Sequence, residues 1–317
     1  MPQLTLAQAR VINPVLTSIA QGIQQNDLIG QYLFPQVPVP LRAGNIITFG
    51  REDFMQYSGL VRAPGGATKR VQFGYASGTY GLLDYSLEGS LPIETLQESI
   101  ASANGFSIDG AALAIRKVSS IMALRLEIQQ AQLATTLGNY PAGNRVTLSG
   151  TSQWNDYSGV SDPAAVVETA KEAVRAATGK RPNTMVLGPV TFARLRQHPR
   201  VRDQFKYVSR DSITVGMLRE FFGVDNVYVG DAVQATDAGV LSDVWGRHAI
   251  LAYTERSALA SYGTPTFGYT YNLDCYPLAE DAYYDRQHKS WFFPVTRSEA
   301  PVIAANSAGY FIQNAVA

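Results

Sequence analysis

The side chains that could carry chemistry are few and poorly spaced. The three histidines, His198, His248 and His288, lie forty to fifty residues apart, so none pairs with another at the four-residue spacing of a zinc-binding helix. His198 precedes a proline at a predicted helix end, where a structural or solvated role is expected. Cys275 is the only cysteine, which excludes an intramolecular disulfide and a thiolate metal cluster. The sequence therefore predicts no metal site and no cofactor.

Two glycine-containing segments match known catalytic motifs only in part. Gly179-Lys180 resembles the end of a phosphate-binding loop, but Val174 stands where the first glycine of that loop is required, and Arg181 stands where a magnesium-binding hydroxyl is required. Ser107 is one residue too far from Gly110 to form a nucleophile elbow. A helix-ending glycine and a helix-capping serine are the favoured interpretations.

An acidic cluster near the C-terminus is a further candidate for metal binding or acid–base chemistry. Its members are Glu280, Asp281, Asp285 and the neighbouring His288. A solvated edge between a strand and a turn is the more frequent origin of such a cluster. Because no nucleophile, base and orienting group come together, the sequence predicts that this protein is not an enzyme.

The elements that would have to position such groups are unusual at the N-terminal end. Prolines at positions 2, 14, 35, 38 and 40 interrupt helix formation, and residues 34–40 are predicted to be extended. Two β-rich runs follow, at about 45–61 and 68–87, joined by a proline–glycine turn signal at 62–67. The pattern predicts an extended arm and then a long two-stranded hairpin.

This hairpin and arm need a surface to lie on, because an isolated hairpin is only marginally stable in water. Its apolar residues must be buried against something; they are Phe49, Phe54, Tyr57, Val71, Phe73 and Tyr75. Other copies of the same chain are the economical candidate. The sequence therefore predicts a homo-oligomer in which arm and hairpin are ordered by neighbouring subunits.

The strongest helical pattern spans residues 107–137. Its predicted core face is Ile108, Ala111, Ala112, Ile115, Val118, Met122, Leu126, Leu133 and Leu137. A second apolar stripe contains Leu113, Ile121, Leu124 and Ile128, so we expect burial from two directions. A helix of this length extends about 45 Å. We predict that Ile115, Val118, Met122 and Leu126 form the centre of its core.

An α/β block is predicted from residue 159 to residue 254. Ser161-Asp162-Pro163 is typical of a helix start, and Gly179 of a helix end. Further helices are predicted at 191–197 and 214–222. Strands are predicted at 184–187, 224–229 and 240–253. From Ser257 onward the chain is rich in aromatic residues and strand-like.

The composition favours a protein that covers its surface with partners. Only 16% of the residues are charged, and 46% are hydrophobic. The 26 basic residues equal the 26 acidic ones, which argues against binding that neutralises nucleic-acid phosphates. The N-terminus lacks a signal-peptide pattern, and no apolar run approaches the ~20 residues that span a bilayer. We expect a soluble chain that is made inside the cell and has no membrane partner.

The order of these elements resembles the major capsid proteins of tailed bacteriophages, which share the HK97-type fold. Recurring family stretches match at 34–39, 62–65, 84–88, 177–183, 186–189, 229–230 and 243–246. The resemblance runs from about residue 10 to about residue 300. It implies an α+β fold with an N-terminal arm, an E-loop hairpin, a spine helix in a peripheral domain, and an α/β axial domain.

The resemblance also implies a division of the chain. The arm would be 1–44 and the E-loop 45–90. The peripheral domain would be 91–158 and 255–317, with the spine helix at 107–137, and the axial domain would be 159–254. Intersubunit contacts would come from Arg62, Pro64, Gly65, Gly66 and Lys69 at the hairpin tip and from Phe34, Pro35, Val37 and Pro38 in the arm. Lys69 is the only hairpin lysine and thus the one candidate for a covalent cross-link.

The implied function is self-assembly into hexamers and pentamers of an icosahedral shell around the double-stranded DNA of a tailed phage. The DNA would be enclosed without sequence-specific binding. Assembly would take place in the host cytoplasm with a portal, a scaffold or protease and a decoration protein; a separate scaffold or prior cleavage is expected, since little chain precedes the arm. Two alternatives stay open: an encapsulin-type bacterial compartment and an α/β ligand-binding enzyme domain.

Overall fold

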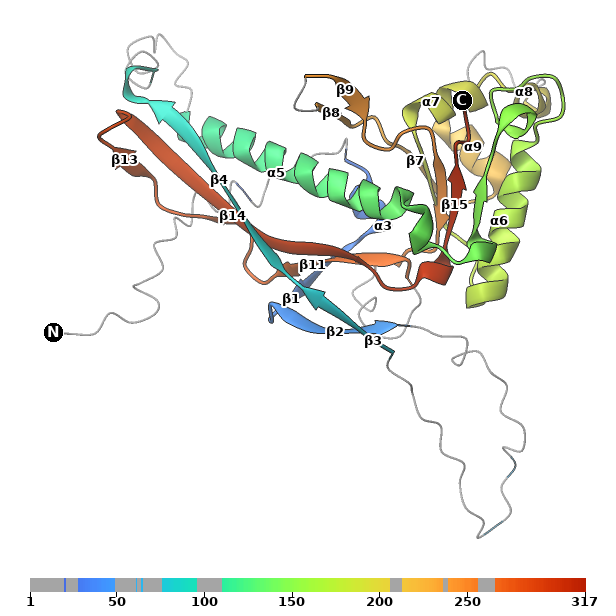
Figure 1. Cartoon of the computed structure of the whole chain (residues 1–317), viewed down its shortest axis with the longest axis horizontal. Helices are drawn as coiled ribbons and strands as arrows, with labels where there is room; N and C mark the ends of the chain where they lie inside the picture. The colour runs from blue at the N-terminus through green and yellow to red at the C-terminus, as the bar shows by residue number, and fades with distance from the viewer. Residues whose placement is uncertain are drawn as a thin grey trace.

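The structure is a computed structural model that describes most of the chain. The described residues are 20, 28–48, 61, 64, 76–95, 110–205, 213–235, 239–255 and 266–317. They form an elongated body, in which one long helix lies along a sheet, and an α/β block at one end of it (Figure 1). Among these residues no helix has the length and apolar character needed to cross a bilayer.

The elongated part, here called the helix–sheet body, consists of the helix α5 (Gly110–Thr135) and a six-stranded sheet. The strands are β1 (Gln36–Val39), β4 (Leu83–Pro92), β11 (Gly268–Leu273), β12 (Leu278–Ala279), β13 (Tyr283–Asp285) and β14 (Ser290–Ile303). The long strand β14 pairs antiparallel with β4 along one edge and with β13, β12 and β11 in turn along the other. Strand β1 extends the sheet by parallel pairing with β11.

Four residues of the predicted core face of the long helix are buried as expected, whereas Ile108 of that face lies outside the described residues. Ile115, Val118, Met122 and Leu126 are all buried. The first three belong to a cluster that also contains Phe293 and Val295 of β14. The helix covers one face of the sheet because this apolar stripe needs an apolar surface to pack on.

Two expectations for this helix are corrected. Leu113 and Ile121 of the second stripe are at least half exposed, so within the described chain the helix is buried mainly from one side. The helix also ends at Thr135, not at 137, because Thr136 is extended and a short 3-10 helix, η2 (Leu137–Asn139), follows. Its last carbonyl groups accept side-chain hydrogen bonds, for example from the Tyr140 hydroxyl to the Ala134 oxygen at 2.7 Å.

The base of the predicted hairpin is present. Strand β2 (Ala43–Thr48) pairs antiparallel with β3 (Ala76–Gly81). The second β-rich run, predicted at 68–87, nevertheless contains two strands with different partners, since β4 leaves the hairpin and pairs with β14. The physical reason is burial: Tyr85 and Leu91 of β4 pack against the core beneath α5.

The α/β block contains a five-stranded sheet with the order β5-β15-β10-β6-β7. Its strands are β5 (Arg145–Thr147), β15 (Gly309–Gln313), β10 (Ala249–Ala252), β6 (Thr184–Leu187) and β7 (Asn226–Val229). Its helices are α6 (Pro163–Thr178), α7 (Pro189–Leu195), α8 (Pro199–Gln204) and α9 (Val215–Phe222). The smaller elements of the structure are α3 (Gly30–Leu33), β8 (Val233–Ala235), β9 (Leu241–Asp243), η3 (Ala142–Asn144), η4 (Gly150–Ser152) and η6 (Asn306–Ala308).

The local signals of the block are confirmed. Asp162 caps α6 by accepting a hydrogen bond from the Ala165 amide, and Gly179 ends the helix at φ 68°. The predicted strand 240–253 is instead two strands, β9 and β10. A turn with Gly246 at φ 57° separates them, and a residue without a Cβ atom adopts that left-handed conformation readily.

The sheet of the block contains two strands, β5 and β15, that were expected in the peripheral domain. Strand β15 lies between β5 and β10, and every residue of β6 and β10 is buried. Strands covered on both faces are apolar on both faces, and the run Tyr310–Ile312 fits this rule. The expected division, with 91–158 and 255–317 outside the block, therefore differs from the observed pairing at β5 and β15.

Candidate assembly surfaces

The segment expected to lie on a neighbour lies partly within the chain's own body. The ring of Phe34 is fully buried, with its centroid 5.6 Å from that of Phe267. A Cβ atom on Gly268 would come within 2.5 Å of this ring, so the pocket exists because position 268 has no side chain. Pro35 is buried as well. This corrects the expectation that Phe34 and Pro35 contact another subunit, because a buried side chain offers no surface.

The following residues of the arm remain accessible in part. Val37 is partly buried, and Pro38 is exposed. Both belong to β1, which is held by its parallel pairing with β11. At the hairpin tip, Pro64 is exposed, whereas Arg62, Gly65, Gly66 and Lys69 lie outside the described residues.

Glu127 of α5 forms a polar site that sequence reasoning missed. Its carboxylate accepts hydrogen bonds from the amides of Ile29 and Gly30, at 3.0 and 2.8 Å, and from the indole nitrogen of Trp245 at 2.7 Å. The residue is almost fully buried, and burial raises its pKa against the opposing effect of these three donors. A signal was present, since Glu127 is the sole acidic residue between 110 and 135.

A second, partly buried polar group lies two residues earlier on the same helix. A terminal nitrogen of Arg125 is 2.5 Å from the Glu299 carboxylate, and its guanidinium carbon lies 3.3 Å above the centre of the Tyr85 ring. Arg297 approaches the other Glu299 oxygen at 3.9 Å. Burial lowers the pKa of Arg297, and burial raises that of Glu299 while both arginines oppose the rise. One carboxylate thus holds two cations between α5 and the sheet.

Several apolar side chains are exposed on the described surface and are available to other molecules. They are Leu41 and Val61 near the hairpin, Leu113 and Ile121 on α5, Leu83 and Leu87 on β4, Tyr283 and Tyr284 on β13, and Tyr157, Val160, Val233, Val240 and Leu241 on the block. Strand β4 also pairs on one side only among the described strands. An edge strand of this length presents unpaired backbone groups to an incoming chain.

The side chains that could carry chemistry do not come together in one site. His288 contacts the Asp285 carboxylate at 2.5 Å in the turn between β13 and β14, while Glu280 and Asp281 point to solvent. His198 is buried, and burial lowers its pKa. The described residues contain no group of three side chains arranged to bind a metal ion. Ser107, the expected helix cap, is outside the described residues.

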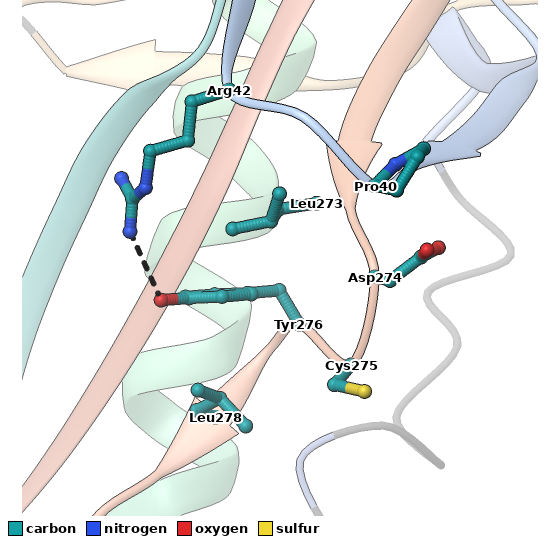
Figure 2. Close-up of a pocket in the computed structure, with 7 residues that line it drawn as sticks. All are labelled: Pro40, Arg42, Leu273, Asp274, Cys275, Tyr276 and Leu278. Atoms are coloured by element: carbon teal, nitrogen blue, oxygen red, sulfur yellow. Dashed lines mark hydrogen bonds between the residues drawn. The ribbon is translucent and has the colours of Figure 1, made fainter. Parts of the chain in front are cut away.

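A shallow pocket lies beside the base of the hairpin (Figure 2). It is lined by Pro40, Arg42, Leu273, Asp274, Cys275, Tyr276 and Leu278 and encloses about 350 Å³. Arg42 donates a hydrogen bond of 3.5 Å to the Tyr276 hydroxyl and forms an ion pair with Asp84. These contacts fasten the start of β2 to β4 and to the turn before β12, so the pocket is part of the support of the hairpin.

Three comparisons bear on the role of these surfaces. The family model described as phage major capsid protein E matches residues 139–277. The major capsid protein of Burkholderia phage BcepMu is 32% identical over 311 residues, which cover 97% of each chain. A solved phage-related protein from Bordetella bronchiseptica RB50 is 38% identical, with a TM-score of 0.82 over 97% of this chain and 98% of that chain.

More distant structures share the fold alone. The capsid of cyanophage P-SCSP1u has a TM-score of 0.55 at 11% identity, over 89% of this chain and 86% of its own. An encapsulin complex from Synechococcus elongatus PCC 7942 has a TM-score of 0.53 at 13% identity, over 99% and 92%. These matches cover the helix–sheet body and the block together.

The predicted fold is therefore confirmed: the chain has the HK97-type α+β capsid fold. The encapsulin likeness supports that fold and carries no functional weight at its low identity. The relatives above 30% identity cover nearly the whole chain and are a phage major capsid protein and a phage-related protein, which favours a structural shell protein over an enzyme domain. This chain belongs to the major capsid proteins of bacteriophages, which form the shell of the virion.

Proposed function

We propose that this chain assembles into hexamers and pentamers of an icosahedral shell that encloses the double-stranded DNA of a tailed phage. The observation that carries this proposal is the paired base of the hairpin, β2 with β3, at the margin of the helix–sheet body (Figure 1). Residues 49–75 join β2 to β3, and a stretch of that length, at about 3.3 Å per residue when extended, can reach a neighbouring subunit.

The surface that receives the hairpin is the exposed apolar face of α5 and the free edge of β4. Leu113 and Ile121 expose apolar side chains to water, and burial against a neighbouring subunit would remove this apolar surface from water. A contact set of interwoven segments buries on the order of 2,000–5,000 Å², well above a standard interface. A rigid body with projecting elements also suits a shell, where one chain meets neighbours at several angles.

Within the shell, the α/β block takes the place of the axial domain around hexamer and pentamer axes, together with β5 and β15. The helix–sheet body takes the place of the peripheral domain. Pro38, Pro64 and the hairpin tip residues Arg62, Gly65, Gly66 and Lys69 contact neighbours. The formal net charge of zero fits a container that encloses DNA without gripping it.

The remaining partners follow from the same role. A portal, a scaffold or protease and a decoration protein assist assembly, which takes place in the cytoplasm of the bacterial host. The encapsulin alternative is separated by gene context: portal and terminase genes beside this gene support the phage role, and a ferritin-like or peroxidase gene opposes it.

The decisive experiment is electron microscopy of the expressed protein and of a variant that lacks residues 56–72. We expect hexamers, pentamers or closed particles from the full chain. We expect the variant to keep a cooperative unfolding transition, because its β4–β14 pairing is untouched, yet to form no closed particles. A monodisperse monomer of the full chain at high concentration contradicts the proposal, and normal particles from the variant contradict the role of the hairpin.

A further inference from the structure

The joint between the two bodies of the chain has a core of its own. One buried cluster lies beneath α5, and a second fills the α/β block. A third cluster lies between them, with Ile29, Leu33 and Phe34 from the N-terminal segment, Ala131 and Ala134 from α5, Val186, Trp245, Ile250 and Phe311 from the block, Phe267 just before β11, and Ala305 and Ala308 between β14 and β15. The N-terminal segment 28–34 is therefore part of the joint.

This segment touches both bodies with aromatic side chains. Phe34 packs on Phe267, which directly precedes β11 of the helix–sheet body. Tyr32 stacks on Tyr228 of β7 in the block, with ring centres 3.9 Å apart and planes 10° from parallel. Stacked rings prefer a defined offset and distance. The two contacts together fix the segment against one body and then against the other.

Glu127 holds the same three parts together by hydrogen bonds. Its carboxylate on α5 accepts hydrogen bonds from the amides of Ile29 and Gly30 in the segment and from the indole N–H of Trp245 in the block. The acceptor is on the helix–sheet body, whereas the donors are on the N-terminal segment and on the α/β block. A rotation of the block relative to the helix–sheet body therefore breaks at least one of these hydrogen bonds. In a buried site such a loss leaves a carboxylate with too few donors, which is costly.

We propose that residues 28–34, Glu127 and Trp245 form a bracket that sets the angle between the α/β block and the helix–sheet body, and thereby the curvature of the assembled shell. In a closed shell both bodies contact neighbours, so a change of angle in each subunit is repeated around the whole particle. The curvature part rests on the proposed shell function; the angle is a property of the chain itself. Glu127 is here a positioning residue.

The first test compares two tryptophan variants. Trp245→Phe removes the N–H that Glu127 accepts and keeps a large ring. Trp154→Phe is the matched control, because Trp154 is also fully buried but its indole nitrogen has no partner in the described structure. We expect Trp245→Phe to shift the particle diameter measured by cryo-electron microscopy and to raise the fraction of open or misshapen particles at least twofold. Trp154→Phe should keep the wild-type diameter, even if it lowers stability equally.

The second test uses the close approach of the segment to α5. A Cβ atom on Gly30 would lie 2.0 Å from the Gln130 side-chain oxygen and 2.7 Å from a Glu127 oxygen. Gly30→Ala must therefore displace either the segment or the ends of the Glu127 and Gln130 side chains, and either movement disturbs the hydrogen bond from the Gly30 amide to Glu127. Gly138→Ala, with nothing within 4 Å of its added methyl group, is the matched control.

The angle itself is read in the soluble chain as a spin-label distance between positions 117 on α5 and 169 on α6, with Cys275 changed to serine. We expect a shifted or broadened distance in Trp245→Phe and in Gly30→Ala, and an unchanged one in the two controls. Distances and diameters that match the wild type in both variants overturn the bracket. A wild type that forms no particles overturns the proposed function instead and leaves the distance measurement to decide on the bracket.

Discussion

The first and second halves of the long helix α5 are buried in different ways. The first half presents Ile115, Val118 and Met122 to apolar side chains of β14. The second half presents Arg125 to Glu299, Glu127 to backbone amides and Trp245, and Gln130 to the Thr270 hydroxyl at 2.8 Å. One helix thus rests on an apolar surface at one end, and at the other its buried apolar residues lie beside a set of paired polar groups.

The difference teaches what each half contributes. Apolar burial stabilises in proportion to area and is indifferent to small shifts of the helix along the sheet. Paired polar groups add little net stability, because desolvation offsets much of their attraction, but each tolerates few positions of its partner. The first half therefore contributes most of the stability of the contact between helix and sheet. The second half determines the positions of the helix, the sheet and the joint relative to one another.

Removing the β14 carboxylate that pairs with the polar half of α5 should have the largest effect. Glu299→Gln leaves Arg125 and Arg297 facing each other without their shared carboxylate. We expect a loss of about 3 kcal/mol in the free energy of unfolding, at the low end for a broken buried pair because Arg125 keeps some contact with solvent. Urea denaturation measures it.

The matched control is Glu172→Gln, which breaks exposed pairs with Arg175 and Arg181. Exposed pairs are screened by water, so the unfolding midpoint should hardly change. An equal loss of unfolding free energy in the two variants would mean that the buried ion pairs of the polar half stabilise the fold no more than exposed ion pairs do.

Truncation in the apolar half should have the next largest effect. Ile115→Ala removes a fully buried side chain and should cost about 2 kcal/mol, at the low end for such changes because alanine favours the helix. Ile115→Val should cost about 1 kcal/mol. The same denaturation assay applies, and a graded series supports area as the source of stability. A loss larger for valine than for alanine would refute that view.

The polar half should also respond to pH, whereas the apolar half should not. The pKa of Glu127 is raised above its usual 4.5 by burial. A carboxyl group with a raised pKa in the folded state stabilises the fold below pH 4.5, and this contribution is lost as the pH rises through the folded pKa. The stability of the wild type minus that of Glu127→Gln should therefore fall from pH 4.5 toward neutrality. Parallel stability curves in the denaturant series would exclude this titration.

The smallest effect on stability is expected on the outer face of the same helix. Ile121 is half exposed, so Ile121→Asn should change the free energy of unfolding by no more than about 0.5 kcal/mol. Particle yield by size-exclusion chromatography should nevertheless drop, because the variant places a polar group in the proposed interface with a neighbouring hairpin. Wild-type yield with unchanged stability would remove this face from the assembly surface.

Several elements could be predicted because their causes are local. The Asp162 cap, the end of α6 at Gly179 and the α9 start at Thr214 depend on residues within one helical turn. The buried face of α5 follows from the spacing of its apolar residues. The order of such elements was also sufficient for the capsid fold to be expected.

Other features could not be predicted, because they depend on distant partners. A run of alternating residues at 68–87 shows that strands form, but not that β4 leaves β3 for β14. A phenylalanine at 34 is apolar wherever it lies, and the space left at Gly268, more than two hundred residues away, decides that it is buried in its own chain. No residue near Glu127 in sequence predicts its burial, because its donors, the Trp245 indole and the amides of Ile29 and Gly30, are about a hundred residues away along the chain.

By itself the sequence determined the starts and ends of α6 and α9, the apolar face of the spine and the family to which the chain belongs, since backbone propensity and side-chain spacing act over a few residues. Only the tertiary structure decided which strands pair, which arm residues stay free for neighbours, and where a buried carboxylate finds its donors. Those outcomes depend on contacts between residues that are far apart in the sequence, and no local sequence pattern predicts such contacts.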